Sequence, residues 1–225
     1  MAGNEKIWTA VDRYAAGSLL GSDPVMEDIL ERNRGSGLPA IDVSPLQGKF
    51  LDLMVRMCGA RHILEIGTLG GYSTVWMARA LPAGGRIVTL ELEERHARIA
   101  RRNFAAAGVS DRIELHVGPA LSSLERLGEA RADPFDLIFI DADKPNNRRY
   151  LEWAMRLARP GTVIICDNVI RDGAVIEADS RDASVEGARD VFSFFGGHRR
   201  LEATALQTVG EKGHDGFAMA IVNGD

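Results

Sequence analysis

Short apolar runs alternate with helical patterns along most of the chain. The runs are HILEI (62–66), RIVTLEL (86–92), RIELHV (112–117), FDLIFID (135–141) and TVIICD (162–167). Residues with helical spacing lie between them, at about 73–81, 93–107, 119–127 and 147–158. This alternation is typical of parallel strands joined by right-handed helical crossovers. We therefore predict a parallel sheet that is covered by helices on both faces.

The two ends of the chain follow other patterns. Residues 5–34 have apolar positions at helical spacing, with Asp23 expected to cap a helix that begins at Pro24, and another helix is predicted over 47–57. Near the other end, RLEATALQTVG and FAMAIVN are separated by only EKGHDG. That connection is too short for a crossover helix, so an antiparallel hairpin at the sheet edge is predicted.

Parallel strands followed by a reversed last strand narrow the fold class. The pattern predicts a doubly wound α/β protein with a mostly parallel seven-stranded sheet and an antiparallel last strand. This arrangement resembles the Rossmann-like fold of class I S-adenosylmethionine (SAM) methyltransferases, here with extra N-terminal helices. We expect one domain over 1–225, made of an N-terminal helical extension (1–58) and a Rossmann-like core (59–225).

Composition and charge exclude several classes of protein. Hydrophobic residues make up 45% and charged residues 26% of the chain, and the formal net charge of -5 disfavours nucleic acid and anionic membranes as partners. Two cysteines, Cys58 and Cys166, do not support a disulfide scaffold or a zinc site. Neither a signal peptide nor a membrane span of about 18 apolar residues is recognisable, so we expect a cytoplasmic protein.

A glycine-rich turn follows the first predicted strand. Gly67, Gly70 and Gly71 lie between that strand and the next helix, where ligands of open α/β sheets bind. Leu69 stands where a dinucleotide fingerprint has its second glycine, and the turn lacks the lysine of a phosphate-binding loop. The turn favours a nucleoside ligand without phosphates, although simple strand–helix packing is an alternative.

Two acidic residues flank this turn. Glu65 comes just before it, where a carboxylate could face the cationic amino-acid end of SAM. Glu91 ends the second strand and could accept hydrogen bonds from both hydroxyls of a ribose. Alternatively, Glu91 and Glu93 merely begin the next helix, where acidic side chains favour the dipole. Because the glycine turn precedes it, we favour the ligand interpretation of Glu91.

Two consecutive strands end in carboxylates. Asp141 follows one strand, and Asp167 with Asn168 follows the next. Neighbouring strand ends lie about 5 Å apart, so these side chains are predicted to form an all-oxygen site for Mg²⁺, with Mn²⁺ or Ca²⁺ as alternatives. Any one aspartate could instead be a turn former or a helix cap. For Asp143 we favour a cap of the helix that follows Pro145.

Lys144 lies directly beyond these carboxylates in the sequence. An amine beside a metal site is positioned to take a proton from a substrate hydroxyl. A solvated surface lysine is an equally good interpretation of the sequence. The polar segment 169–185, which follows the metal residues, is expected to be a loop that covers the site.

The segments LEIGTLGGYS, FIDADK and CDN resemble the cation-dependent O-methyltransferases of the caffeoyl-CoA and catechol type, and the likeness covers nearly the whole chain. It implies metal ligation by Asp141, Asp167 and Asn168, and catalysis by Lys144 together with Asp141. The family often has an aspartate where this chain has Pro119, so one usual adenine contact is missing. The implied SAM-binding residues are Val43, Glu65, Gly67, Thr68, Ser73, Glu91, Ala120 and Asp141.

The resemblance also implies a substrate and an assembly. The expected acceptor is a vicinal dihydroxy phenol that the metal holds, and the expected assembly is a homodimer. A methyltransferase of a hydroxylated tRNA base, a nicotinamide-dependent dehydrogenase and a non-catalytic SAM-binding protein are the alternatives. Neither the identity of the acceptor nor the position that is methylated follows from the sequence.

Overall fold

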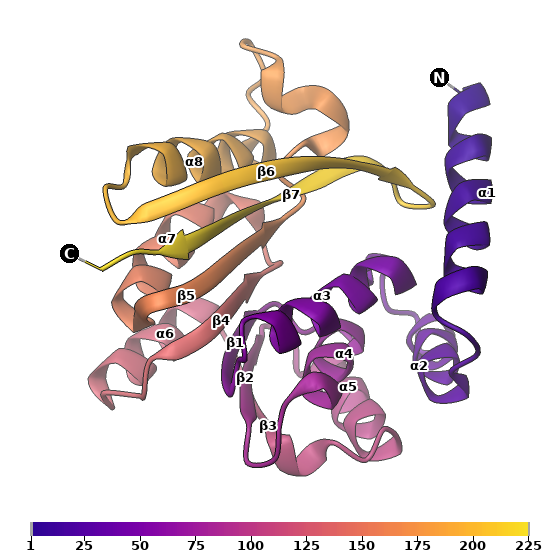
Figure 1. Cartoon of the computed structure of the whole chain (residues 1–225), viewed down its shortest axis with the longest axis horizontal. Coiled ribbons are helices and arrows are strands. Elements are labelled where there is room, and N and C mark those ends of the chain that lie inside the picture. The colour runs from indigo at the N-terminus through magenta and orange to yellow at the C-terminus, as the bar shows by residue number, and fades with distance from the viewer. Residues whose placement is uncertain (1, 225) are drawn as a thin grey trace.

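Seven strands form one sheet in the order β3-β2-β1-β4-β5-β7-β6 (Figure 1). This computed structural model describes the backbone of residues 2–224 and the side chains of residues 5–224. The strands are β1 (His62–Ile66), β2 (Arg86–Glu91), β3 (Ile113–Val117), β4 (Phe135–Ile140), β5 (Ala158–Asp167), β6 (Leu201–Gly210) and β7 (Gly213–Val222). Only β7 is reversed, because it pairs antiparallel with both β5 and β6. The predicted doubly wound sheet with an antiparallel last strand is confirmed.

Helices cover the two faces of the sheet, as predicted. One face carries α2 (Pro24–Gly35), α3 (Pro45–Met57), α4 (Tyr72–Ala80) and α5 (Glu94–Ala106), and the other carries α6 (Ala120–Glu129), α7 (Asn147–Leu157) and α8 (Ala183–Gly197). Adjacent residues of β1 belong to hydrophobic cores on opposite faces of the sheet. Ile63 packs with the first group of helices and Leu64 with the second. A strand buried on both faces explains why its sequence is a continuous apolar run.

The predicted helical region 5–34 is two helices. The helix α1 (Ala2–Leu19) lies apart from the sheet and beside the tip of the β6–β7 hairpin (Figure 1). There the Asp12 carboxylate accepts a hydrogen bond from the Glu211 N–H (2.8 Å). The Asp23 side chain accepts from the Met26 N–H (3.3 Å), which confirms the predicted cap. The boundary at residue 58 stays a prediction, although α3 packs on α4 within one core.

Two sequence predictions about the C-terminal third were wrong. The helix α8 was not predicted, and it begins within the segment 169–185 that was expected to be loop. Its glycines obscure the apolar spacing in the sequence, but Val185, Ala188 and Val191 are buried. The hairpin turn is also shorter than predicted, because β7 begins at Gly213 and pairs directly with Gly210. Cross-strand pairing therefore extends over residues that look like loop in the sequence.

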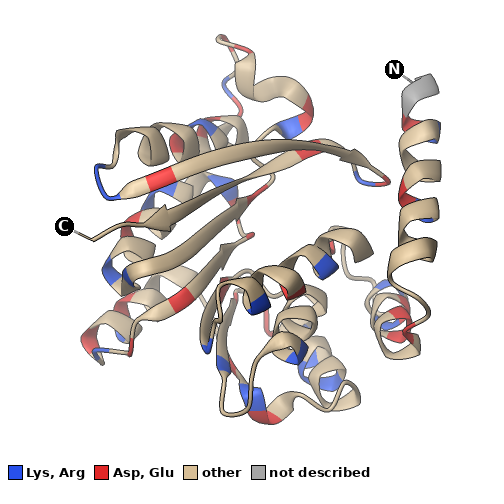
Figure 2. Cartoon of the chain, viewed as in Figure 1, with Lys and Arg blue, Asp and Glu red and all other residues tan. Residues whose placement is uncertain are grey.

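Charge and hydropathy add little to this picture. Lys and Arg are interspersed with Asp and Glu along the helices and loops (Figure 2). Among residues 2–224, no helix is long and apolar enough to cross a membrane.

Candidate active site

A cavity of about 670 Å³ opens where the carboxyl ends of the central strands meet. Its walls come from the loop before α3, the glycine turn, the end of β2, the start of α6 and the segments that follow β4 and β5. Ligands of open α/β sheets bind at this edge. Among the residues assigned from the sequence, the lining includes Val43, Gly67, Thr68, Ser73, Glu91, Ala120, Asp141, Lys144 and Asn168.

The glycine turn needs glycine at its first position. Gly67 has a φ of 100°, and an added Cβ would lie 2.1 Å from the Asp141 carbonyl oxygen. Leu69 is also left-handed, with a φ of 50°, which is unusual for a residue with a side chain. The Leu69 N–H donates to Glu91 Oε2 at 2.7 Å, and this bond helps to hold the turn. Thus the position that breaks the dinucleotide fingerprint still adopts a conformation that favours glycine.

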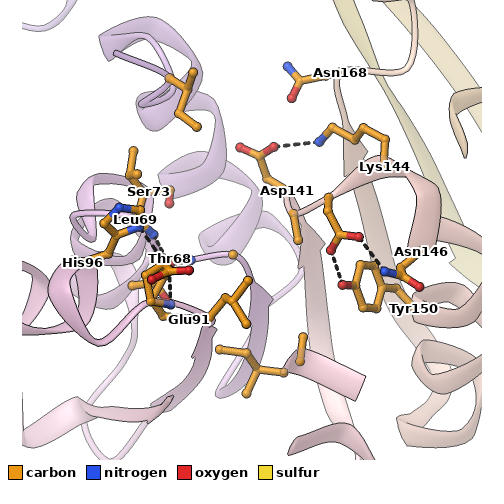
Figure 3. A pocket seen from close by; sticks show the side chains of 18 of the residues that line it. Thr68, Leu69, Ser73, Glu91, His96, Asp141, Lys144, Asn146, Tyr150 and Asn168 are labelled. Carbon is orange, nitrogen blue, oxygen red and sulfur yellow. Dashed lines mark hydrogen bonds and ion pairs between the residues drawn. The ribbon is translucent and has the colours of Figure 1, made fainter. Parts of the chain in front are cut away.

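Glu91 is the last residue of β2 and faces the cavity (Figure 3). Because α5 begins at Glu94 with Glu93 as its N-cap residue, the helix-start alternative fits Glu93 but is wrong for Glu91. Its Oε2 also accepts from the Thr68 N–H (3.3 Å), and its Oε1 lies 3.1 Å from His96 Nδ1. The carboxylate is therefore held in one orientation by groups of the protein.

Glu65 lies beneath the cavity and is not part of its lining. Its carboxylate is completely buried and accepts hydrogen bonds from Ser73 Oγ (2.6 Å) and Thr89 Oγ1 (2.6 Å), and also from Thr74. Burial raises the pKa of Glu65 to about 7. Since Ser73 does line the cavity, Glu65 orients a residue of the wall and does not face the cavity itself.

The three predicted metal residues come from adjacent strand ends. The register of β4 and β5 pairs Ile140 with Cys166, so Asp141 and Asp167 follow at neighbouring positions. Burial, and then the charge of Asp141, raise the pKa of Asp167 above its usual range. Asn168 is left-handed, with a φ of 57°, and lines the cavity together with Asp141.

Asp167 itself is buried beside the cavity and held by two donors. Its Oδ2 accepts from Gln47 Nε2 (2.6 Å), and its Oδ1 accepts from the Asn168 N–H (2.9 Å). Gln47 was not predicted as a site residue. Only the tertiary structure shows it, because the helix that carries Gln47 lies far away in the sequence. The hydrogen bonds fix the direction of the Asp167 carboxylate.

Lys144 is 7% exposed, so the solvated-surface interpretation is wrong. Its Nζ lies 2.9 Å from Asp141 Oδ1, and Asn168 lies above this ion pair in Figure 3. The helix α8 packs closely against the Lys144 backbone at Gly187. A Cβ added at Gly187 would lie 1.9 Å from the Lys144 carbonyl oxygen, so this contact needs glycine. A buried amine therefore lies beside the carboxylates at the edge of the cavity.

The comparisons with known proteins agree on one family. A family model described as O-methyltransferase matches residues 18–208. The chain is 48% identical to a catechol O-methyltransferase from Niastella koreensis, with 97% of this chain and 99% of that protein covered. It is 51% identical to a catechol O-methyltransferase from Mycobacterium tuberculosis, with 94% of each covered. The chain belongs to the O-methyltransferase family.

Solved structures of O-methyltransferases have the same fold. One from Bacillus cereus, in complex with SAH, is 55% identical with a TM-score of 0.96, and 97% of this chain and 99% of that chain are covered. Another, from Streptomyces achromogenes, is in complex with SAM and is involved in tomaymycin synthesis. It is 44% identical with a TM-score of 0.94, and 98% of this chain and 99% of that chain are covered. The family predicted from the sequence is confirmed, and a nicotinamide-dependent dehydrogenase is excluded.

Asp143 in this O-methyltransferase does not cap a helix with its side chain, as was favoured from the sequence. It precedes the short 3-10 helix η2 (Lys144–Asn146), but its carboxylate accepts from Asn146 Nδ2 (2.5 Å) and from the Tyr150 hydroxyl (Figure 3). Burial, followed by this contact, raises the pKa of Tyr150. Asp143 and Tyr150 both line the cavity of the methyltransferase, and neither was assigned there from the sequence.

Proposed function

We propose that this O-methyltransferase transfers a methyl group from SAM to one oxygen of a catechol-like, vicinal dihydroxy phenol. The proposed cofactor is a divalent cation, with Mg²⁺ as the first choice. The observation that carries the proposal is the position of Asp141, Asp167 and Asn168 at the edge of the cavity that contains Glu91. The names of the two catechol O-methyltransferase relatives, and the SAH and SAM in the two solved structures, support it.

In this proposal the SAM site runs from Val43 and Ser73 to Glu91. The fixed Glu91 carboxylate accepts hydrogen bonds from the ribose hydroxyls, and the left-handed turn at Gly67 lets the backbone approach the cofactor. Pro119 offers adenine neither a side-chain acceptor nor an N–H. The Ala120 N–H belongs to the first residue of α6 and has no partner within that helix, so it can donate to adenine instead.

The metal residues fit a hard divalent cation. Two carboxylates and one amide form an all-oxygen donor set of the kind that Mg²⁺, Mn²⁺ and Ca²⁺ prefer. Burial, and then repulsion by Asp141, raise the pKa of Asp167, and a cation between the two carboxylates would relieve that repulsion. When bound, the cation lowers the pKa of a substrate hydroxyl. Lys144 lies beside Asp141, and its neutral amine, formed once its own proton has left to solvent, takes up the proton of that hydroxyl.

Methylation of catechol should depend on added metal. The enzyme is supplied with SAM, Mg²⁺ and either catechol or its 1,3-isomer resorcinol, and the methylated products are measured by mass spectrometry. We expect methylated catechol only, loss of the product in excess chelator, and recovery when Mg²⁺ is restored. Resorcinol is the control because its two oxygens are too far apart to chelate one ion. Equal rates in chelator, or equal methylation of resorcinol, would contradict the proposal.

The same assay separates the remaining alternatives. A hydroxylated tRNA serves as a third acceptor, and the intermixed charges in Figure 2 lead us to expect no reaction with it. Methylation of the tRNA, with no methylation of catechol or resorcinol, would identify the enzyme as a base methyltransferase. Binding of SAM without product from any acceptor would favour a non-catalytic SAM-binding protein.

We also propose a homodimer that forms through α1. Apolar residues are exposed on this helix at helical spacing: Ile7 (61%), Val11 (58%) and Tyr14 (78%). A second copy would cover them, since such stripes mark contact surfaces. Sedimentation velocity should show a dimer for the natural chain and a monomer for a variant with Val11→Ser and Tyr14→Ser. A dimer in both proteins would exclude α1 as the interface.

A further inference from the structure

The segment after β5 carries an arginine into the cavity. Arg171 lies three residues beyond Asn168 and lines the same cavity. Both residues are left-handed, with φ values of 56° and 57°. Residues with a side chain rarely adopt this conformation, asparagine more readily than arginine, and such strain persists where the surroundings hold it.

Asp215 on β7 holds the backbone of this segment. Its Oδ1 accepts hydrogen bonds from the N–H groups of Ile170 (3.0 Å) and Arg171 (3.1 Å). The same oxygen also accepts from the Gly216 N–H (2.9 Å). Because three backbone donors use this oxygen, Asp215 mainly fixes the backbone conformation. The strained position of Arg171 is therefore part of the folded structure.

The guanidinium of Arg171 is poorly satisfied within the protein. Its Nε is buried and has no hydrogen-bond partner among the described residues. Its ion pair with Asp215 spans 3.9 Å from Nη1 to Oδ2, which is too long for a hydrogen bond. A guanidinium has five N–H donors, and donors that remain without partners after burial are costly. The side chain is 35% exposed, so an anion in the cavity can pair with the exposed part of the guanidinium, although not with the buried Nε.

The other lysine or arginine among the described residues that line the cavity is Lys144. Its Nζ is already paired with Asp141 at 2.9 Å. Most of the remaining charged residues of the lining are acidic, including Glu91 and Glu93 on the proposed SAM side. Although Asp141 and Asp143 also line the cavity, Arg171 is the lining cation that has no carboxylate within hydrogen-bond distance among the described residues.

We propose that Arg171 determines acceptor specificity by pairing with a carboxylate on the catechol-like substrate. This inference rests on the proposed function, because the catechol oxygens are taken to lie at Asp141 and Asn168. The planar fork of a guanidinium matches a carboxylate in two parallel hydrogen bonds. The proposed SAM site runs from Val43 and Ser73 to Glu91, whereas Arg171 follows Asn168 in the segment after β5, so we assign the anion to the acceptor and not to the carboxylate of SAM. The substrate class is therefore a dihydroxylated aromatic acid.

Steady-state kinetics with two acceptors test this assignment. The acceptors are 3,4-dihydroxybenzoate and the neutral 4-methylcatechol. We expect the natural enzyme to prefer the acid. Arg171→Met should lower kcat/KM for the acid by about 10- to 100-fold, mainly through KM, and change the value for 4-methylcatechol by less than about threefold. The control is Arg181→Met, which removes an exposed arginine nearby in the sequence. This variant should leave kcat/KM unchanged for both acceptors.

Calorimetric binding of the same two acceptors, with SAH and Mg²⁺ present, tests Arg171 even if no turnover occurs. A preference for the acid that disappears in Arg171→Met supports the proposal in either case. Equal losses for both acceptors, or no preference in the natural enzyme, would overturn it. Failure of the proposed function would instead appear as no methylation of either acceptor.

Discussion

Replacing Asp141 by asparagine should lower the rate of catechol methylation by about 10³-fold or more at saturating SAM. The substitution keeps the shape of the side chain but removes one of the two carboxylates that would hold the cation. It also leaves Lys144 Nζ, now 2.9 Å from Asp141 Oδ1, without its ionic partner. Loss of this ion pair should lower the free energy of unfolding by about 1–3 kcal/mol, partly offset because the repulsion between Asp141 and Asp167 is also removed. The rate and the thermal midpoint are both measured.

Two measurements show whether that loss arises from the metal. Titration with Mn²⁺, followed by electron paramagnetic resonance, should show much weaker binding to Asp141→Asn than to the natural enzyme. The control is Asp172→Asn, which removes an exposed carboxylate from the segment after β5 and should keep full activity. A folded Asp141→Asn enzyme with activity within about tenfold of the natural enzyme would refute the assignment of Asp141.

Replacing Lys144 by methionine should lower kcat by about 10²- to 10⁴-fold, the usual contribution of a general acid or base. The side chain is 7% exposed and fills space beside the carboxylates, which methionine can also fill. KM for the acceptor should change much less than kcat, since the loss affects the proton transfer and not substrate binding. Product formation under single-turnover conditions measures this step directly.

Arginine at the same position separates proton uptake from charge pairing. Lys144→Arg keeps a cation beside Asp141 but cannot act as a base, because a guanidinium does not lose its proton in proteins. We expect Lys144→Arg to be nearly as slow as Lys144→Met. Recovery of most of the activity in Lys144→Arg would mean that Lys144 only pairs with Asp141. Melting curves and SAH binding are recorded for both variants, so that a misfolded protein is recognised.

The sequence predicted the architecture well because strand positions depend on local patterns. The run HILEI coincides with β1, and most other boundaries differ by one or two residues. Errors occurred where long-range pairing decides. The start of β5 at Ala158 and the start of β7 at Gly213 follow from their partner strands and not from their own hydrophobicity. The helix α8 is stabilised by packing on α7 and the sheet, which compensates for its glycines.

The site was predicted only in part, because some of its residues follow from the strand pattern and others depend on long-range packing. Asp141, Asp167 and Asn168 follow apolar strands, and parallel strands bring their carboxyl ends to one edge, so their proximity follows from the topology. Gln47, His96 and Tyr150 carry no comparable signal. They reach the site because their helices pack against that edge, and a sequence pattern does not specify which face of a helix meets which strand end.

The sequence by itself determined the order of strands and helices, the glycine turn and the family of this O-methyltransferase. The tertiary structure alone showed that Lys144 is buried against Asp141, that Glu65 lies beneath the cavity, and that Arg171 lines the cavity with its Nε unpaired. The physical reason is that secondary structure follows from the periodic pattern of neighbouring residues. Burial, pKa and hydrogen-bond satisfaction depend instead on groups that are distant in the chain and meet only when it folds.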